Sequence, residues 1–235
     1  ISMIEKMLSR SMEHAGMDVG VTRFLRALTQ FVMNVFLLFM IAGQLGMDSA
    51  SIVAVLGAAG LALSLALQQS LGNFAGGLLI LIMKPFRVGD YIISPSGEGK
   101  VSMVGLVYTT ILTTDNKTIT IPNGTLSNST VTNVTAMDKR MLELKVGIAY
   151  EADIRTAKAV LERVYREHPM VKKDEDIKVF VDSLGDSSVV LGIRGWVETS
   201  DYWQTRWDIL ERIKLSFDEA GIEIPYNKMD VHLKQ

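Results

Sequence analysis

The chain contains no cysteine and few of the residues that usually build catalytic or metal sites. Among its 235 residues there are no Cys, three His and five Pro, and aromatic residues make up 7%. Without cysteine a disulfide framework, a Cys-ligated zinc site and a thiol nucleophile are all excluded. His14, His168 and His232 lie far apart in the sequence, so we expect no metal site.

The sequence also lacks a strong charge of one sign. The formal net charge is -2, and the part from Lys84 onward contains 20 Lys and Arg against 22 Asp and Glu. Such a balance gives no basic footprint for nucleic acid. Phosphate-binding GxxxxGK[ST], HExxH and GxSxG motifs are absent as well. We therefore expect no catalytic residues, no cofactor and no nucleic-acid partner.

What the chain does have is a long uncharged stretch, Ser49–Met83, with no charged residue between Asp48 and Lys84. As one helix these residues would be about 52 Å long, against a hydrocarbon core of roughly 30 Å, so the helix must tilt, break or leave the membrane. The uniform apolar character ends at Gln68. We therefore predict two helices, a pore-lining helix over 48–69 and a bent amphipathic continuation over 70–86. The predicted hinge residues are Gln68, Gln69, Gly72, Gly76 and Gly77.

Small residues recur at helical spacing along the first of these helices, on two of its faces. They are Ala54, Ala58 and Ala62 on one face, and Gly57, Gly60 and Ser64 on the other. Small faces let helix backbones approach closely in lipid, and two such faces predict two neighbours. Copies of one helix packed on both sides close a homo-oligomeric ring. Leu61 and Leu65 then point to the axis as a pore seal, because narrow apolar rings gate by dewetting.

A transporter bundle or a membrane-anchored scaffold could use the same small-residue packing. A transporter, however, usually places polar or ionisable groups at mid-membrane and contains internal repeats. Here the pore helix carries Gly, Ala and Leu at that level. This composition favours a wide pore with little selectivity.

A second uncharged segment, residues 27–47, is long enough for one transmembrane helix. Basic residues flank the two spans on their outer sides, whereas the connection between them carries only Asp48. The positive-inside rule then places 1–26, as a linker, and 84–235 in the cytoplasm.

In the continuation of the pore helix, an apolar stripe is expected to lie against the membrane interface or the soluble body, and Pro85 ends the helix. The stripe consists of Leu71, Phe74, Leu78 and Ile82, with Asn73, Gly76 and Gly77 around the other side.

The remaining chain changes to β-rich and then mixed patterns. Short β-branched runs separated by turn clusters predict a small antiparallel β domain over 87–139, in which Ile121–Gly124 forms a turn. Residues 140–225 show the order β-α-β-β-α followed by a strand at Ile222–Ile224, which is typical of a split βαβ, ferredoxin-like unit. The fold class is thus a membrane α-helical part followed by β and α+β domains.

Several of these stretches resemble the small-conductance mechanosensitive channel (MscS) family. They are ASIVAVLGAAGLALSLALQ (50–68), SLGNFAGG (70–77), KPFRVGDYI (84–92), IPNG (121–124), VGIAYEADI (146–154), YWQTRWDILERIK (202–214) and AGIEIPYNKMDVHLK (220–234). The resemblance covers nearly the whole chain. It departs at Gln69, where the best-known members carry Gly at the pore-helix kink, and at Ser64, which replaces another Gly.

The resemblance implies more than the residue patterns do. It implies an Sm-like β domain over 87–139, a C-terminal barrel strand over 226–235 contributed by all subunits, and a further membrane helix upstream of residue 1. It also implies a homoheptamer in a bacterial-type inner membrane. This homoheptamer contacts membrane lipids and encloses a hollow cytoplasmic vestibule. The expected function is a channel, opened by membrane tension, that passes ions and small solutes and relieves hypo-osmotic stress.

Replacing Leu65 with Ser tests the predicted seal. A hydroxyl in a dewetted apolar ring offers water a hydrogen-bond partner, so the Leu65→Ser channel should open at lower tension and slow the growth of its host. The opening threshold is measured by patch recording under graded suction. An unchanged threshold would remove Leu65 from the gate.

Overall fold

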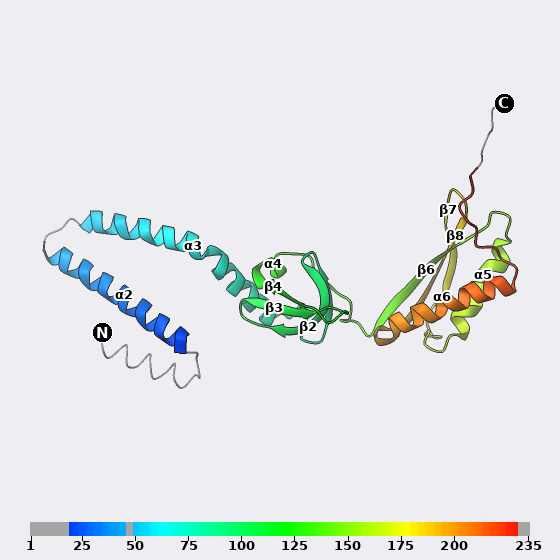
Figure 1. The fold of residues 1–235 in the computed structure, drawn as a ribbon, viewed down its shortest axis with the longest axis horizontal. Helices are drawn as coiled ribbons and strands as arrows, with labels where there is room; N and C mark the ends of the chain where they lie inside the picture. Colours follow the sequence, from blue (N-terminus) through cyan, green and yellow to red (C-terminus); the bar gives the residue numbers. More distant parts are fainter. Residues whose placement is uncertain (1–18, 46–48, 230–235) are drawn as a thin grey trace, which may run out of the picture. The chain divides into compact units, whose positions relative to one another are not determined.

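The computed structural model describes residues 19–45 and 49–229. The chain forms two compact units whose boundary lies within one long helix, the first extending to Leu71 and the second beginning at Gly72. Among the described residues of the first unit, the regular elements are helices. The second contains a β-rich domain and an α+β domain, as expected for the fold class (Figure 1).

Within residues 19–45 and 49–229, two helices are long and apolar enough to cross a membrane, by length and composition. Helix α2 spans Val19–Gln44, and its apolar part runs over Thr22–Gln44. Residues 19–26 of the predicted linker over 1–26 are helical and continue into the apolar part of α2, and the role of this segment as a linker stays a prediction. Arginine is a good helix former, and its long side chain can reach the membrane surface, so Arg23 and Arg26 do not end the helix. The rest of that linker lies outside the described residues.

Helix α3 runs without interruption over Ser49–Met83. The predicted division into two separate helices is not observed, because Gln is a good helix former and isolated glycines remain compatible with a helix. A bend at Gln68–Ser70 stays a prediction. The helix ends before Pro85, as predicted: the Lys84 N–H donates to the Ile80 carbonyl at 2.9 Å, and Lys84 then adopts a positive φ of 49°.

The β domain is a five-stranded antiparallel sheet in the order β4-β3-β2-β1-β5. Its elements are β1 (Tyr91–Ser94), β2 (Gly97–Val104), β3 (Tyr108–Leu112), β4 (Thr118–Pro122), α4 (Asn123–Ser127) and β5 (Thr132–Asn133). Alternate residues such as Val101, Ile111 and Ile121 fill the core together with Ile80 of α3. The prediction of a turn at Ile121–Gly124 is wrong. Strand β4 passes directly into helix α4, and the extended Pro122 occupies the N-cap position.

The α+β domain follows the predicted order up to its last helix. Its elements are β6 (Lys139–Ile148), α5 (Ile154–Glu167), β7 (Lys178–Leu184), β8 (Val189–Glu198), the 3-10 turn η1 (Thr199–Asp201) and α6 (Tyr202–Glu219). The Asp153 carboxylate caps α5 by accepting hydrogen bonds from the backbone N–H groups of Arg155 and Thr156. These bonds satisfy two of the donors that a helix N-terminus leaves free.

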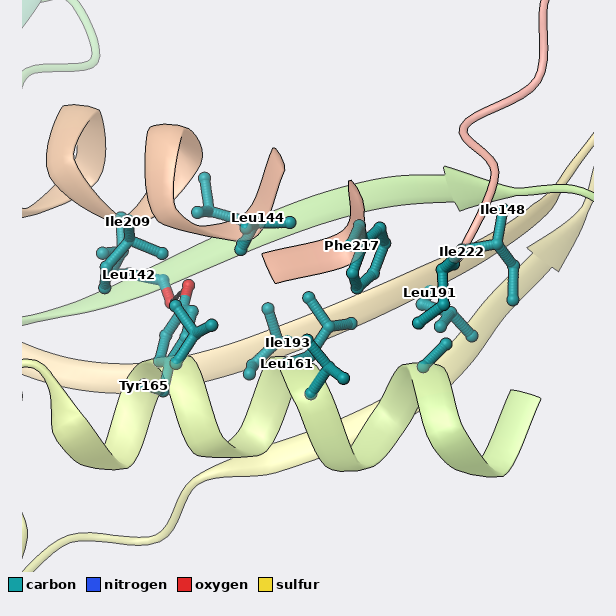
Figure 2. Packing of buried hydrophobic residues seen from close by; sticks show 14 of the residues in the cluster. Leu142, Leu144, Ile148, Leu161, Tyr165, Leu191, Ile193, Ile209, Phe217 and Ile222 are labelled. Carbon is teal, nitrogen blue, oxygen red and sulfur yellow. Dashed lines mark hydrogen bonds between the residues drawn. The ribbon is translucent and has the colours of Figure 1, made fainter. Parts of the chain in front are cut away.

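The core of this domain lies between the sheet and both helices. Figure 2 shows Leu161 and Tyr165 of α5 pointing towards Ile193 of β8 and Leu142 of β6, and all four side chains are buried. Ile209 and Phe217 of α6 belong to the same cluster. The opposite side of the sheet carries charged and aromatic residues instead: Arg194 lies over the Phe180 ring and pairs with Glu143 at 2.8 Å.

The predicted last strand at Ile222–Ile224 is wrong, because the sheet has three strands in the order β6-β8-β7. Gly221, with φ +66°, turns the chain back after α6 and places Ile222 in the core. A backbone hydrogen bond joins this segment to the chain after β6, from the Ala149 N–H to the Glu223 carbonyl at 3.0 Å. Residues 226–229 have no regular secondary structure, and the rest of the predicted barrel strand lies outside the described residues.

His168 closes the C-terminal end of α5 and is almost completely buried. Its Nδ1 accepts a hydrogen bond from the Met170 N–H at 3.3 Å, and its Nε2 lies 3.8 Å from the Asp208 carboxylate. Burial lowers the pKa of His168, Arg212 lowers it further, and Asp208 partly opposes both. A proton on Nδ1 would displace the Met170 hydrogen bond.

His168 should therefore make this domain less stable in mild acid. Because the folded-state pKa lies below the ordinary value of about 6.5, protons bind the unfolded chain better, and stability is lost as the pH falls below that value. The midpoint of thermal unfolding in detergent should fall further between about pH 7 and about pH 5 in the parent than in His168→Asn. Asn keeps an acceptor for Met170 and does not titrate. Equal decreases in the two proteins would contradict this role.

Candidate pore helix and its attachment to the β domain

The predicted pore-lining part of α3 makes no packed contacts within the described chain. Every described residue from Ala50 to Gly72 is exposed, including all six small residues of the predicted packing faces. A Cβ added at Gly57 or Gly60 would meet nothing within 4 Å. The described residues leave this apolar helix surface uncovered, and lipid or other subunits can cover it.

The two leucines of the predicted seal lie on the same part of the helix. Leu61 and Leu65 are 64% and 63% exposed, and their spacing of four places them on one face. Gln68, Gln69 and Gly72 are also exposed, and a Cβ at Gly72 would meet nothing within 4 Å. The seal, the packing faces and the hinge remain predictions, because a single chain does not test them.

Burial of α3 begins abruptly at Asn73. The buried positions are Asn73, Gly76, Gly77 and Ile80, which are spaced as one stripe of a helix. This stripe faces the β domain. The helix thus has an exposed N-terminal part and a C-terminal part docked on a folded domain.

Where this stripe packs on the β domain, the backbone of α3 lies directly against the backbone of the domain. A Cβ added at Gly77 would lie 2.0 Å from the Leu106 carbonyl oxygen, and one at Gly76 would lie 2.6 Å from the Asn123 carbonyl oxygen. Distances this short leave no room for any side chain. Gly76 and Gly77 therefore allow the helix to approach the β2–β3 connection and the start of α4.

Polar groups at this contact satisfy one another. The Gly124 N–H donates to the Asn73 side-chain oxygen at 3.1 Å. The buried Asn123 accepts from the Thr109 hydroxyl at 2.7 Å and donates to the Gly105 carbonyl at 2.8 Å. Because buried amides are costly unless they are hydrogen-bonded, these bonds fix the position of Asn123 under the helix.

The sequence leaves two places for the apolar stripe of this part of α3, the membrane interface and the soluble body, and the structure does not support the second. The apolar residues Leu71, Phe74, Leu78 and Ile82 are exposed, and the small polar face packs on the β domain. The apolar stripe does not pack on the described part of the soluble body, and its position at the membrane interface stays a prediction. The spacing of Asn73, Gly76, Gly77 and Ile80 was the available signal for the docked face. The role of Asn123 had no comparable signal, because it depends on contacts distant in sequence.

Within the described ranges 19–45 and 49–229, no group of three or more His, Asp or Glu residues could hold a metal ion. The site consists of helix surfaces and backbone contacts. Such an arrangement can bind other helices or lipid, and it can transmit movement to the β domain.

Three models of mechanosensitive ion channel domains match consecutive parts of the chain. They are described as transmembrane helices 2/3 (residues 30–68), the beta-domain (69–136) and the MscS C-terminal domain (142–224). The chain belongs to the MscS family of mechanosensitive ion channels. The predicted resemblance and fold class are thus confirmed, and the boundary between the first two models falls at Gln68–Gln69, inside α3.

The matches to individual relatives extend over almost the full chain. A small-conductance mechanosensitive channel from Edwardsiella ictaluri is 38% identical over 232 residues, which cover 99% of this chain and 81% of the relative. The crystal structure of Helicobacter pylori MscS, in a closed state, matches with a TM-score of 0.88 and 28% identity, covering 99% of this chain and 93% of that one. Arabidopsis thaliana MSL1 matches at a TM-score of 0.78 and 21% identity, covering 95% and 82% of the two chains, and shares the fold.

The docked face gives a prediction with a matched control in the same helix. Gly77→Ala places a methyl group against the Leu106 carbonyl, and overpacking of this kind costs about 1–3 kcal/mol. Gly72→Ala meets no atom, and it replaces a poor helix former by a good one, so it should leave stability unchanged or raise it. Thermal unfolding of the full chain in detergent should show a lower midpoint for Gly77→Ala alone. Equal midpoints for the two variants would rule out the close contact.

Proposed function

We propose that this MscS-family chain assembles into a homoheptamer in a bacterial-type inner membrane and forms a pore that opens under membrane tension. The pore passes ions and small solutes with little selectivity and relieves hypo-osmotic stress. Residues 84–235 lie in the cytoplasm. The observation that carries the proposal is the exposed, small-residue surface of α3 between Ala50 and Gly72, which only neighbouring subunits or lipid can cover.

In this proposal the small residues form the contacts between adjacent α3 helices. Gly57 and Gly60 have open space around them in the single chain, so the backbone of a neighbouring helix can approach closely. Leu61 and Leu65 then line the narrowest part of the ring. Water gains no hydrogen-bond partner there, which closes the pore to ions without blocking it sterically.

Tension supplies the energy for opening because the open ring occupies more area in the membrane plane. Helix α2 contacts lipid and moves with it, and the upper part of α3 follows. Differential contact with lipid in the two states provides the required free-energy difference. The docked stripe at Asn73, Gly76 and Gly77 holds the lower part of α3 on the β domain. A hinge then lies on the membrane side of Asn73, where Gln68, Gln69 and Gly72 are exposed.

Patch recording of the full chain reconstituted into liposomes tests the proposal. Stepwise currents should appear above a threshold of suction and should be absent from liposomes without protein. Gly60→Val inserts bulk at the proposed helix contact and should shift the threshold or abolish assembly, because overpacking around a ring is repeated in every subunit.

Gly43→Val in α2 is the matched control. Gly43 also has open space around it, but it lies outside the proposed subunit contact, so its threshold should equal that of the parent. If the parent protein gives no suction-dependent current, the proposed function fails. If Gly60→Val behaves like Gly43→Val, the small-residue faces are not subunit contacts.

A further inference from the structure

A cavity of about 400 Å³ lies between the β domain and the start of α6, within the second compact unit. Tyr91 of β1 and Glu98 of β2 line one wall. Arg140 of β6, Thr199 of η1 and Trp203 of α6 line the other. The volume falls within the range of small-molecule sites, and the lining combines an apolar surface with a few polar groups.

Hydrogen bonds hold the connecting segment 134–138 to both walls. On the β-domain side, the Tyr91 N–H donates to the Thr135 hydroxyl at 2.8 Å, and the Val134 N–H donates to the Tyr91 carbonyl at 3.0 Å. On the other side, the Thr199 hydroxyl donates to the Met137 carbonyl at 2.5 Å, and its N–H donates to the Asp138 carbonyl at 2.8 Å. These bonds give the cavity a defined shape.

Two opposite charges line this cavity without meeting each other. Neither Glu98 nor Arg140 takes part in an ion pair or a side-chain hydrogen bond within the part of the chain that the structure describes. The Arg140 guanidinium carbon lies 3.8 Å from the centre of the Tyr202 ring. Stacking occupies the face of a guanidinium and leaves its N–H groups available at the edge.

The wall formed by the β domain carries the negative charge of the Glu98 carboxylate. Burial raises the pKa of the Tyr91 hydroxyl, and the nearby Glu98 carboxylate raises it further, so Tyr91 stays a neutral hydrogen-bonding group. Trp203, on the same wall as Arg140, adds an indole face, which attracts cationic nitrogen and quaternary ammonium groups. Glu98 and the Trp203 ring thus favour a cation, and Arg140 favours a carboxylate.

We propose that this cavity binds a small zwitterionic solute of the amino-acid or betaine type. Its carboxylate accepts charge-assisted hydrogen bonds from Arg140, and its cationic nitrogen lies between Glu98 and the Trp203 ring. A simple anion would leave Glu98 uncompensated, and a simple cation would leave Arg140 uncompensated. Only a molecule that carries both charges satisfies both walls.

Tryptophan fluorescence of the full chain in detergent tests this site, with glycine betaine as the probe. The parent should give a saturable change that sucrose at equal osmolality does not reproduce. Choline carries only the cation and acetate only the anion, so each should bind at least about tenfold more weakly. A response to sucrose equal to that of glycine betaine would overturn the site, and equal binding of choline or acetate would overturn the zwitterion as its ligand.

Variants that neutralise one charge test whether glycine betaine binds in this cavity. Arg140→Gln and Glu98→Gln should each weaken glycine betaine binding at least about tenfold, because each removes one charged partner. Arg155→Gln and Glu219→Gln, at exposed positions in α5 and α6, should bind like the parent. Glu98 is exposed, so its replacement by Gln leaves the fold intact, and parental binding by that variant overturns the proposal. No current is measured, so failure here leaves the proposed channel function standing.

Discussion

The contact between two glycines of α3 and the backbone of the β domain is the constraint on which the rest of the structure depends. Gly77 brings the helix so close to the Leu106 carbonyl that no side chain fits between them. Asn73 of the helix accepts a hydrogen bond from the Gly124 N–H of the β domain, and the buried Asn123 donates to the Gly105 carbonyl within that domain. One long apolar helix is thereby joined to a folded domain by glycines that have no side chain and by asparagines whose side chains are held by hydrogen bonds.

This arrangement separates two requirements that one helix must meet. Small residues before Gly72 leave a smooth surface that is exposed in the described part of the chain, which suits association with copies of the same helix in lipid. Small residues after Gly72 serve close packing against a domain rich in backbone polar groups. The same residue type therefore has two physical uses along a single helix. The change from one use to the other coincides with the boundary between the two compact units.

The α+β domain depends on a different interaction, the burial of alternate strand residues under two helices. Leu142, Ile193 and Phe217 form part of a core that is independent of α3. Its other sheet face carries cations stacked on aromatic rings and paired with carboxylates, as at Arg194, Phe180 and Glu143. The cavity at Arg140 differs from this face, because there the charges remain unpaired.

The sequence by itself determined the two apolar helices, the end of α3 before Pro85, the order of strands and helices up to α6, and the family. Each of these follows from local patterns: hydrophobic length, proline geometry, residue periodicity and motif identity. Only the tertiary structure decided that Asn73, Gly76 and Gly77 face the β domain, that Asn123 starts a helix instead of a turn, and that Ile222 enters the core without forming a strand. These outcomes depend on contacts between residues far apart in the chain, such as Gly77 with Leu106 and Ala149 with Glu223. The spacing of Asn73, Gly76 and Gly77 marks a small face on the helix, but it does not tell what packs against that face.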